Sequence, residues 1–358
     1  MTRLDEFRGR DNNFNLIRLL AAVLVIWTHA AFGAMARGHI EAAYRFFGLR
    51  AGDIGVDVFF ILSGFLVSKS LDGKTLAEFA WARCMRIYPA LWVSITVSLV
   101  LVALVFSDQP ALRFLTSGST VAYLARNATL IHGAQLTLPH AFAHVDGEFN
   151  VSLWTLPFEV KLYGLLAVLG MTLGLRARYV AALAAIGAAG ILLQNLAPAA
   201  LQFGVRGRFL YLFFAGALAY TLRRRIVLRT WLAVALAAAV AATVAVTSRY
   251  SVRQAALLLA LPYLLLWLGL VPRGGPLRLW NRLGDYSYGM YIYAYPVHIA
   301  LSSMGAAVTV EGNFLLTTLI TLPIAIVSWH ALEKRALRRS LPAWIAHTFA
   351  RRVPTAAE

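Results

Sequence analysis

Two ionisable residues fall on one face of the first apolar segment of the chain. In the stretch RLLAAVLVIWTH, Arg18 and His29 bracket ten residues that are almost all apolar. In an α-helix, eleven steps of about 100° bring these side chains within roughly 20° of one another, about 16 Å apart along the axis. This arrangement suits a channel with a cation at its mouth and a base inside. Taken singly, Arg18 could instead extend to the membrane surface, and His29 could be a hydrogen-bonded core histidine.

Two further arginines are spaced to point the same way. Arg83 and Arg86, in RCMRIYPALW, stand three residues apart and therefore share a helix face. Together they could hold a phosphate group through paired, charge-assisted hydrogen bonds. The alternative is that they only anchor the cytoplasmic end of a membrane span, as basic residues at that end commonly do.

A carboxylate and a tyrosine form a third candidate pair. Glu159 and Tyr163, in NVSLWTLPFEVKLY, are neighbours at i and i+4, whereas Lys161 lies on another face. We expect Glu159 about two helical turns inside the outer membrane surface, where a buried carboxylate needs a partner. In GVDVFFILSGF, Ser63 accompanies glycines that allow close helix packing, and Asp57 could serve either structure or function.

Composition places these groups in a membrane protein. The 358 residues are 60% hydrophobic and 14% charged, with a mean hydropathy of +0.68. Soluble proteins are nearer 45–50% apolar and about 25% charged. The net charge of +17 would suggest nucleic acid in a soluble chain, but here the basic residues lie mostly between apolar segments. We therefore attribute the charge to membrane orientation and expect no nucleic-acid partner.

Hydropathy predicts ten membrane spans, each of about 20 mostly apolar residues. They are 14–35, 53–71, 87–107, 151–173, 177–197, 207–222, 228–246, 252–271, 286–305 and 313–332. The two tails and the even-numbered connections carry 21 basic residues, and the odd-numbered connections carry 9. This bias predicts that both termini are cytoplasmic.

The fold class is thus an all-α polytopic membrane protein. We expect a tail at 1–13, a transmembrane domain at 14–335 and a basic tail at 336–358. The long connection at 108–150 falls on the outside, either as a lid over an outward-facing site or as a solvated loop.

The order of the motifs resembles that of the membrane-bound acyltransferase-3 family, whose members O-acylate sugars and most often acetylate bacterial surface polysaccharides. The resemblance covers about residues 12–335. It is carried by Arg-x10-His in the first span and by GVDVFFILSGF, RCMRIYP, NVSLWTLPFE, GDYSYGMYIY and SWHALE. In one motif the chain departs from the family, because Ala294 stands where many members have histidine, and His298 lies four residues further on.

The resemblance implies roles for the residues that match. The catalytic candidates are His29, as the base that takes the proton of the acceptor hydroxyl, and Glu159, which would orient the sugar or the histidine. The candidates for binding the phosphates of the donor are Arg18, Arg83 and Arg86. The candidates for contacting substrate are Ser63, Trp154 and Tyr163.

The function implied is transfer of an acyl group, expected to be acetyl, from cytoplasmic acyl-CoA to a hydroxyl of a surface or exported glycan. The glycan could be a polysaccharide or its lipid-linked precursor, and the enzyme would lie in the bacterial inner membrane. We expect no permanently bound cofactor and no metal. The alternative is a secondary transporter of a small polar solute, although no internal repeat is visible. A purely structural membrane subunit would leave the buried polar residues unexplained.

Overall fold

The computed structural model describes residues 2–6, 11–35, 40–142, 147–196, 201–272, 280–281, 283–306 and 309–344. Parts of both expected tails lie outside these residues. So do several of the basic residues counted for orientation, namely Arg8, Arg10, Arg37, Arg273, Arg278, Arg282, Arg351 and Arg352.

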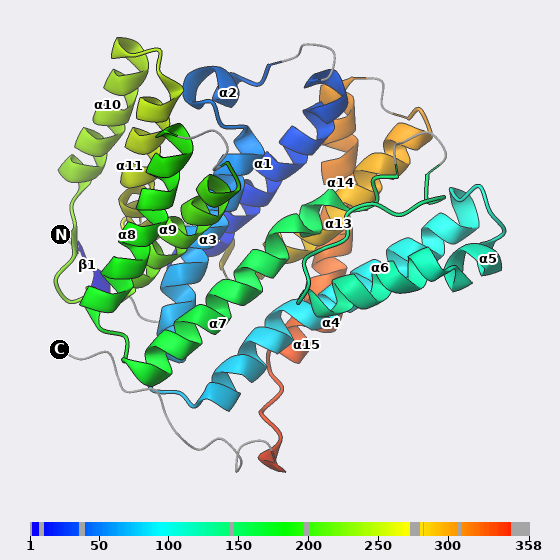
Figure 1. Cartoon of the computed structure of the whole chain (residues 1–358), viewed down its shortest axis with the longest axis horizontal. Helices are drawn as coiled ribbons and strands as arrows, with labels where there is room; N and C mark the ends of the chain where they lie inside the picture. The colour runs from blue at the N-terminus through cyan, green and yellow to red at the C-terminus, as the bar shows by residue number, and fades with distance from the viewer. Residues whose placement is uncertain are drawn as a thin grey trace.

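Helices make up most of the described chain (Figure 1). The long ones are α1 (Phe14–Met35), α3 (Ala51–Leu71), α4 (Leu76–Val105), α7 (Leu156–Thr172), α8 (Ala177–Leu196), α9 (Leu201–Thr221), α10 (Thr230–Val246), α11 (Tyr250–Leu270), α13 (Ser287–Ser303) and α14 (Val310–Ser328). The short ones are η1 (Leu4–Glu6), α2 (Ala42–Phe47), α5 (Ala111–Thr116), α6 (Gly118–Thr129), η2 (Val151–Thr155), η4 (Trp329–Glu333) and α15 (Lys334–Ala336). A two-residue ladder pairs β1 (Thr2–Arg3) with β2 (Val227–Leu228).

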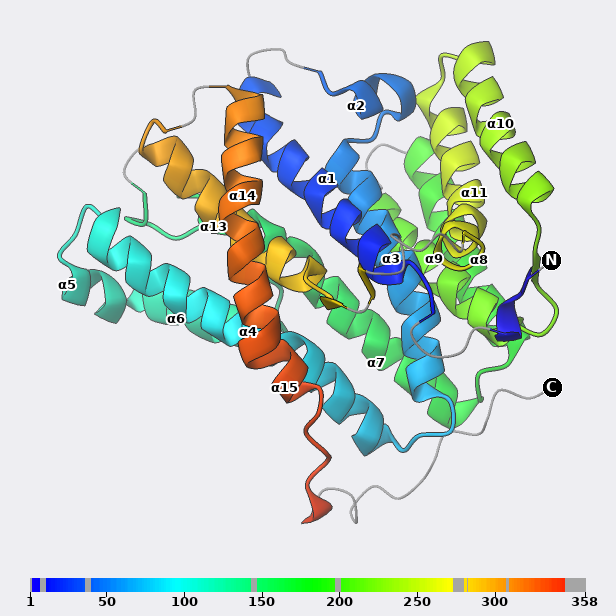
Figure 2. The same cartoon turned by 180° about the vertical axis from the view of Figure 1, so that it is seen from behind.

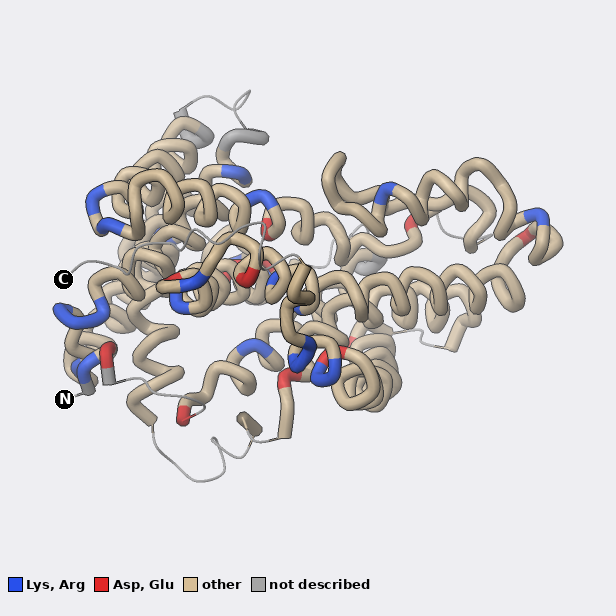
Figure 3. The backbone as a smooth tube through the Cα atoms, turned by 90° about the horizontal axis from the view of Figure 1, so that it is seen from below, with Lys and Arg blue, Asp and Glu red and all other residues tan. Residues whose placement is uncertain are grey.

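A helix is present at each of the ten predicted spans, which confirms the all-α class apart from the small ladder. Among the described residues, six helical stretches are long and apolar enough to cross a membrane, including Phe14–Phe32 of α1 and Val310–Ala336, which continues beyond α14. Figure 3 shows long uncharged stretches of helix between the few charged positions. The count of ten crossings and the cytoplasmic termini stay predictions.

The third predicted span begins much earlier than expected. We expected it at 87–107, but α4 starts at Leu76, where Thr75 and Glu78 cap it reciprocally. Hydropathy placed the start too late because the charged side chains of the first turns lower the average. Arg83 and Arg86 therefore lie well inside a helix, with side chains directed into the bundle, rather than at its entrance.

The predicted outer connection, 108–150, is largely structured. Its first part forms α5 and α6, and α6 lies along α4 (Figure 1). Two side chains of α4 bind its last turn, because Tyr88 and Trp92 donate hydrogen bonds to the carbonyls of Thr129 and Ala128. His144 and Asp146, which also belong to this connection, lie outside the described residues.

Close helix contacts fix α3 within the bundle. A Cβ on Gly55 would overlap the carbonyl of Ala21 on α1, and a Cβ on Gly64 would overlap the carbonyl of Phe213 on α9. These contacts confirm that the glycines of GVDVFFILSGF serve close packing. Between the same helices, Asp57 is fully buried and forms a two-point ion pair with Arg208 of α9, which favours its structural role.

The first helix, α1, packs against α13 and α14 near the other end of the sequence, next to the site. Figure 2 shows α1 beside α13 and α14, and each of the three contacts the other two. The start of α1 is also tied to the end of α11, because the backbone nitrogen of Asn13 donates to the carbonyl of Gly269 at 2.8 Å. The bundle thus brings the N-terminal turns of α1 next to the loop that leads into α13.

Candidate active site

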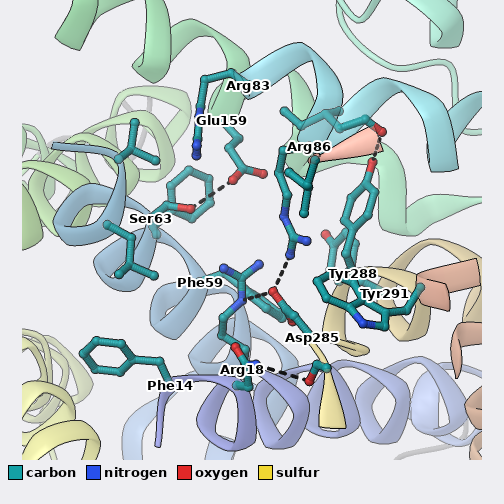
Figure 4. A pocket seen from close by; sticks show the side chains of 18 of the residues that line it. Phe14, Arg18, Phe59, Ser63, Arg83, Arg86, Glu159, Asp285, Tyr288 and Tyr291 are labelled. Atoms are coloured by element: carbon teal, nitrogen blue, oxygen red, sulfur yellow. Dashed lines mark hydrogen bonds and ion pairs between the residues drawn. The ribbon is translucent and has the colours of Figure 1, made fainter. Parts of the chain in front are cut away.

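A cavity of about 480 Å³ lies among α1, α3, α4, α7 and the loop before α13. Figure 4 shows polar side chains from these separate elements pointing into it. Of the eight predicted site residues, six line the cavity, namely Arg18, Ser63, Arg83, Arg86, Glu159 and Tyr163. Trp154 and His29 are not among the lining residues.

One carboxylate that lines the cavity, that of Asp285, is shared by two arginines. The Asp285 carboxylate lies 2.5 Å from a terminal nitrogen of Arg86 and 3.5 Å from Nε of Arg18. Arg18 Nε also donates to Ser287 Oγ at 3.3 Å, and that hydroxyl donates to Asp285. Burial raises the pKa of Asp285, but the two guanidinium groups and the hydrogen bonds from Ser287 more than offset it and bring the pKa to about 2. Asp285 is therefore an anion at neutral pH.

A second carboxylate approaches Arg86 from the end of α14. Glu333 lies 3.6 Å from Arg86 and accepts a hydrogen bond from Ser328 Oγ at 3.1 Å. The backbone from Trp329 to Glu333 is a single π-helical turn, a local widening that is frequent at functional sites. The SWHALE motif thus supplies a counter-charge for Arg86.

Arg83 has no such counter-charge. Its guanidinium lies 5.8 Å from the ring centre of Tyr163, and it donates to Ser70 Oγ at 3.3 Å. Within the described part of the chain, no carboxylate oxygen comes within 4.0 Å of it, and its buried Nε has no hydrogen-bond partner. Lys334 and Arg338 add positive charge to the lining, which therefore holds five cationic side chains against the carboxylates of Glu159 and Asp285. This excess favours an anionic ligand.

Glu159 obtains its partners from two different helices. Ser63 Oγ of α3 donates to Glu159 at 2.9 Å, and the Tyr163 hydroxyl, one turn along α7, also donates to it. The expected i, i+4 pairing is confirmed. Glu159 shares one cavity with all three arginines, and its depth below the outer membrane surface stays a prediction. Regular helix begins only at Leu156, and the preceding Asn150 already lies inside the bundle, where it donates to the Ile292 carbonyl of α13.

His29 lies beyond one end of the cavity. The lining reaches Tyr291, whose hydroxyl is 2.6 Å from Thr155 Oγ1 and whose ring contacts Phe59. His29 contacts Tyr295, one turn further along α13, with ring centroids 4.8 Å apart. Arg18 and His29 are both directed into the bundle as predicted, but of the two only Arg18 lines the cavity.

Trp154 serves packing in this structure. Its ring lies 5.5 Å from that of Phe209 and 6.1 Å from that of Phe158, and the side chain is half-buried. The predicted substrate contact of Trp154 has no support from the cavity lining.

Sequence reasoning missed the two carboxylates that organise the arginines. Asp285 and Glu333 both lie inside motifs that the sequence singles out, GDYSYGMYIY and SWHALE. The signal that could have found them is charge balance, because arginines buried on one side of an apolar bundle need acidic partners. Tyr288 was also missed. It packs 5.6 Å from the Arg86 guanidinium and donates to the carbonyl of Ile87.

The helical bundle and its cationic cavity are those of a membrane protein with a polar site buried among its helices. The sequence profile of the acyltransferase-3 family, described as an acyltransferase domain, matches residues 11–332, and the chain belongs to this family of enzymes. An O-acetyl transferase of Shigella phage Sf6 is 26% identical over an alignment of 341 positions, which covers 93% of this chain and 98% of the relative. Nodulation protein 10 of Rhizobium leguminosarum bv. viciae is 30% identical over an alignment of 360 positions, which covers 92% of this chain and 94% of the relative. No solved structure matches the chain.

Proposed function

We propose that this acyltransferase moves an acetyl group from cytoplasmic acetyl-CoA to a hydroxyl of a surface or exported glycan, in the bacterial inner membrane. The observation that carries the proposal is the cavity in which Arg18, Arg83 and Arg86 converge. The phage relative, an O-acetyl transferase similar along nearly its whole length, supports acetyl as the group transferred.

The proposed binding of the donor rests on the positive charge of the cavity lining. Coenzyme A carries a diphosphate and a 3′-phosphate, and guanidinium groups bind phosphate oxygens through two parallel hydrogen bonds. Of the three arginines, Arg83 is the one with no carboxylate oxygen within 4.0 Å among the described residues, so we assign it the strongest phosphate contact. Arg18 and Arg86 would be shared between the donor and Asp285.

The transfer step is assigned to His29, the predicted catalytic base. The acceptor oxygen attacks the thioester carbonyl, a new C–O ester bond forms, the C–S bond breaks and coenzyme A leaves as a thiolate. His29 takes the acceptor proton as general base. Because Tyr291 lines the cavity and His29 contacts Tyr295, one turn further along α13, the pantetheine arm would extend past Tyr291 to bring the thioester to the histidine.

The decisive experiment uses purified protein in lipid nanodiscs with radiolabelled acetyl-CoA. The acceptor is surface glycan from the source bacterium, stripped of its esters with mild alkali. We expect label on the glycan with wild type and none with His29→Ala. Membrane insertion and acetyl-CoA binding of the variant serve as controls. A protein that binds acetyl-CoA without labelling any glycan would contradict the proposal, and uptake of a solute into sealed vesicles would favour a transporter instead.

A further inference from the structure

A polar cluster lies beyond the end of the cavity, around Tyr295. The rings of His29 and His298 both contact the Tyr295 ring, with centroid separations of 4.8 and 5.6 Å. The Tyr295 hydroxyl donates to Glu148, which lies just before η2. The two histidines come from different helices, α1 and α13, and His298 has no role in the function proposed so far.

The hydrogen bonds around His298 fix the position of its proton. Ser302 Oγ donates its one proton to the carbonyl of His298 at 3.0 Å, so it can only accept from Asn313, 3.0 Å away. The Asn313 atom facing Ser302 is therefore the amide nitrogen. The other Asn313 atom is the carbonyl oxygen, which accepts from Thr317 Oγ1 at 3.0 Å and faces His298 Nδ1 at 2.6 Å.

Because an amide oxygen only accepts, Nδ1 of His298 must carry a proton. In the neutral ring the lone pair is then on Nε2, so His298 is held as a proton acceptor at that nitrogen. His29 differs in this respect. Its Nδ1 is buried and has no hydrogen-bond partner in the described residues, so nothing there selects its tautomer.

The two histidines also influence one another. They are close enough to interact electrostatically, and Arg50 at the start of α3 acts on His29 as well, while Glu148 acts on His298. Two imidazolium ions this close would repel, so the pair accommodates one proton far more readily than two.

The geometry points to His298 as a second base of the acyl-transfer site, held in its proton-accepting tautomer by Asn313 and coupled to His29 across Tyr295. This inference rests on the proposed function. When the acceptor oxygen forms its ester bond and coenzyme A leaves as a thiolate, one proton is released. His29 receives that proton and Nε2 of His298 takes it over. His298 then releases it to bulk water, where the coenzyme A thiolate is protonated, so both rings are neutral for the next turnover.

Three variants test the role of the pair by kinetics, with acetyl-CoA and the de-esterified surface glycan as substrates. We expect His298→Ala to lower kcat by about 10²- to 10⁴-fold, the usual size of a general-base contribution, with an unchanged KM for acetyl-CoA. Asn313→Leu frees the tautomer and should lower kcat by at least about tenfold. Asn313→Asp keeps an acceptor at Nδ1 and should retain most of the activity. Imidazole added to His298→Ala should restore part of it.

A second readout does not depend on turnover. In protein labelled with ¹⁵N-histidine, the NMR signal that disappears in His298→Ala should be that of a ring protonated at Nδ1. It should persist in Asn313→Asp and shift in Asn313→Leu. A wild-type kcat in His298→Ala, or equal losses in Asn313→Asp and Asn313→Leu, would overturn the inference while leaving glycan acetylation by wild type intact. Failure of wild type to acetylate any glycan would instead overturn the proposed function.

Discussion

A single carboxylate, that of Asp285, is shared by two of the three arginines predicted to bind the donor. Arg86 has a second acidic neighbour in Glu333, whereas Arg83 has neither. At the scale of residues the three arginines are therefore not equivalent, although their spacing in the sequence made them look alike. Of the three, Arg83 is the least neutralised by carboxylates and is therefore the best placed to bind a phosphate. Arg86 contributes more to stability, because its two acidic neighbours join α4 to the loop before α13 and to η4.

This difference predicts unequal effects on donor binding. Arg83→Ala should weaken acetyl-CoA binding by about 1.5–3 kcal/mol, or roughly 10- to 150-fold, because one charge-assisted contact is lost. Arg83→Lys should recover only part of this, since lysine lacks the two-point geometry. Titration of acetyl-CoA against the purified variants measures the effect. Arg206→Ala, an exposed arginine of α9, is the control and should bind as wild type does. Wild-type affinity in Arg83→Ala would remove this residue from the donor site.

Asp285 allows a prediction about stability and pH. Its pKa, about 2 in the folded protein against an ordinary value of 3.8, means that the ionised carboxylate stabilises the fold. By linkage that contribution, about 2 kcal/mol, is fully present above pH 4 and is lost as the pH falls through the folded value. Asp285→Asn should therefore lower the melting temperature in detergent at pH 5, and the loss should shrink as the pH falls towards 2. An equal loss at pH 5 and near pH 2 would show that the charge of Asp285 does not stabilise the fold.

Site residues were predictable from the sequence where the chemical type of the side chain alone indicates its role. Arginines in an apolar setting, and a glutamate one turn from a tyrosine, identified five side chains that do meet in one cavity, and the family resemblance added Ser63. Their partners were not predictable. The contact of Ser63 with Glu159 spans 96 positions, and that of Arg86 with Asp285 spans 199. Such pairs depend on how the helices pack, which periodicity within a single helix does not reveal.

Two elements differ from their predicted form, and both differences move functional groups. α4 begins at Leu76, so Arg83 and Arg86 are helix-interior side chains with restricted rotamers rather than flexible residues at a membrane surface. α7 begins at Leu156, after chain that already lies against α13, so Glu159 reaches the arginines. In both cases hydropathy gave the presence of the helix correctly. It placed the start of α4 too late, because hydropathy does not distinguish charged residues buried inside a helical bundle from charged residues at its surface.

Packing between α3 and its neighbours supplies a prediction at this scale. Gly64→Ala should lower the stability of the bundle by about 1–3 kcal/mol, because a methyl group would overlap the backbone of α9. Thermal unfolding in detergent measures this. Gly118→Ala is the matched control, since a Cβ at Gly118 meets no atom within 4 Å. Equal melting temperatures for the two variants would show that α3 and α9 are not in close contact at Gly64.

For the whole molecule, the orientation in the membrane is a prediction from the basic residues at the ends of the predicted spans. The packing agrees with the predicted alternation, because segments assigned to one side of the membrane meet in space. β1 in the N-terminal tail pairs with β2 after α9, and Asn13 binds the end of α11. The alternation itself requires a membrane to test it.

Cysteine labelling in intact cells provides that test. In a Cys84→Ser background, Thr116→Cys at the exposed end of α5 should react with an impermeant thiol reagent. Thr355→Cys in the C-terminal tail should react only after the cells are lysed. Labelling of Thr355→Cys but not Thr116→Cys in intact cells would reverse the orientation, and with it the assignment of the arginine cavity to the cytoplasmic side.

The position of Asp285 between Arg18 and Arg86 has a consequence for turnover. Any anion that binds these arginines competes with the Asp285 carboxylate, which belongs to the protein and is therefore always present at the site. For the proposed donor, such an internal competitor would weaken the binding of acetyl-CoA and of coenzyme A alike, since both carry the same phosphates. Asp285 would also re-form its ion pairs with Arg18 and Arg86 as the product leaves. An enzyme built this way gives up some affinity for its donor and in return is less prone to product inhibition.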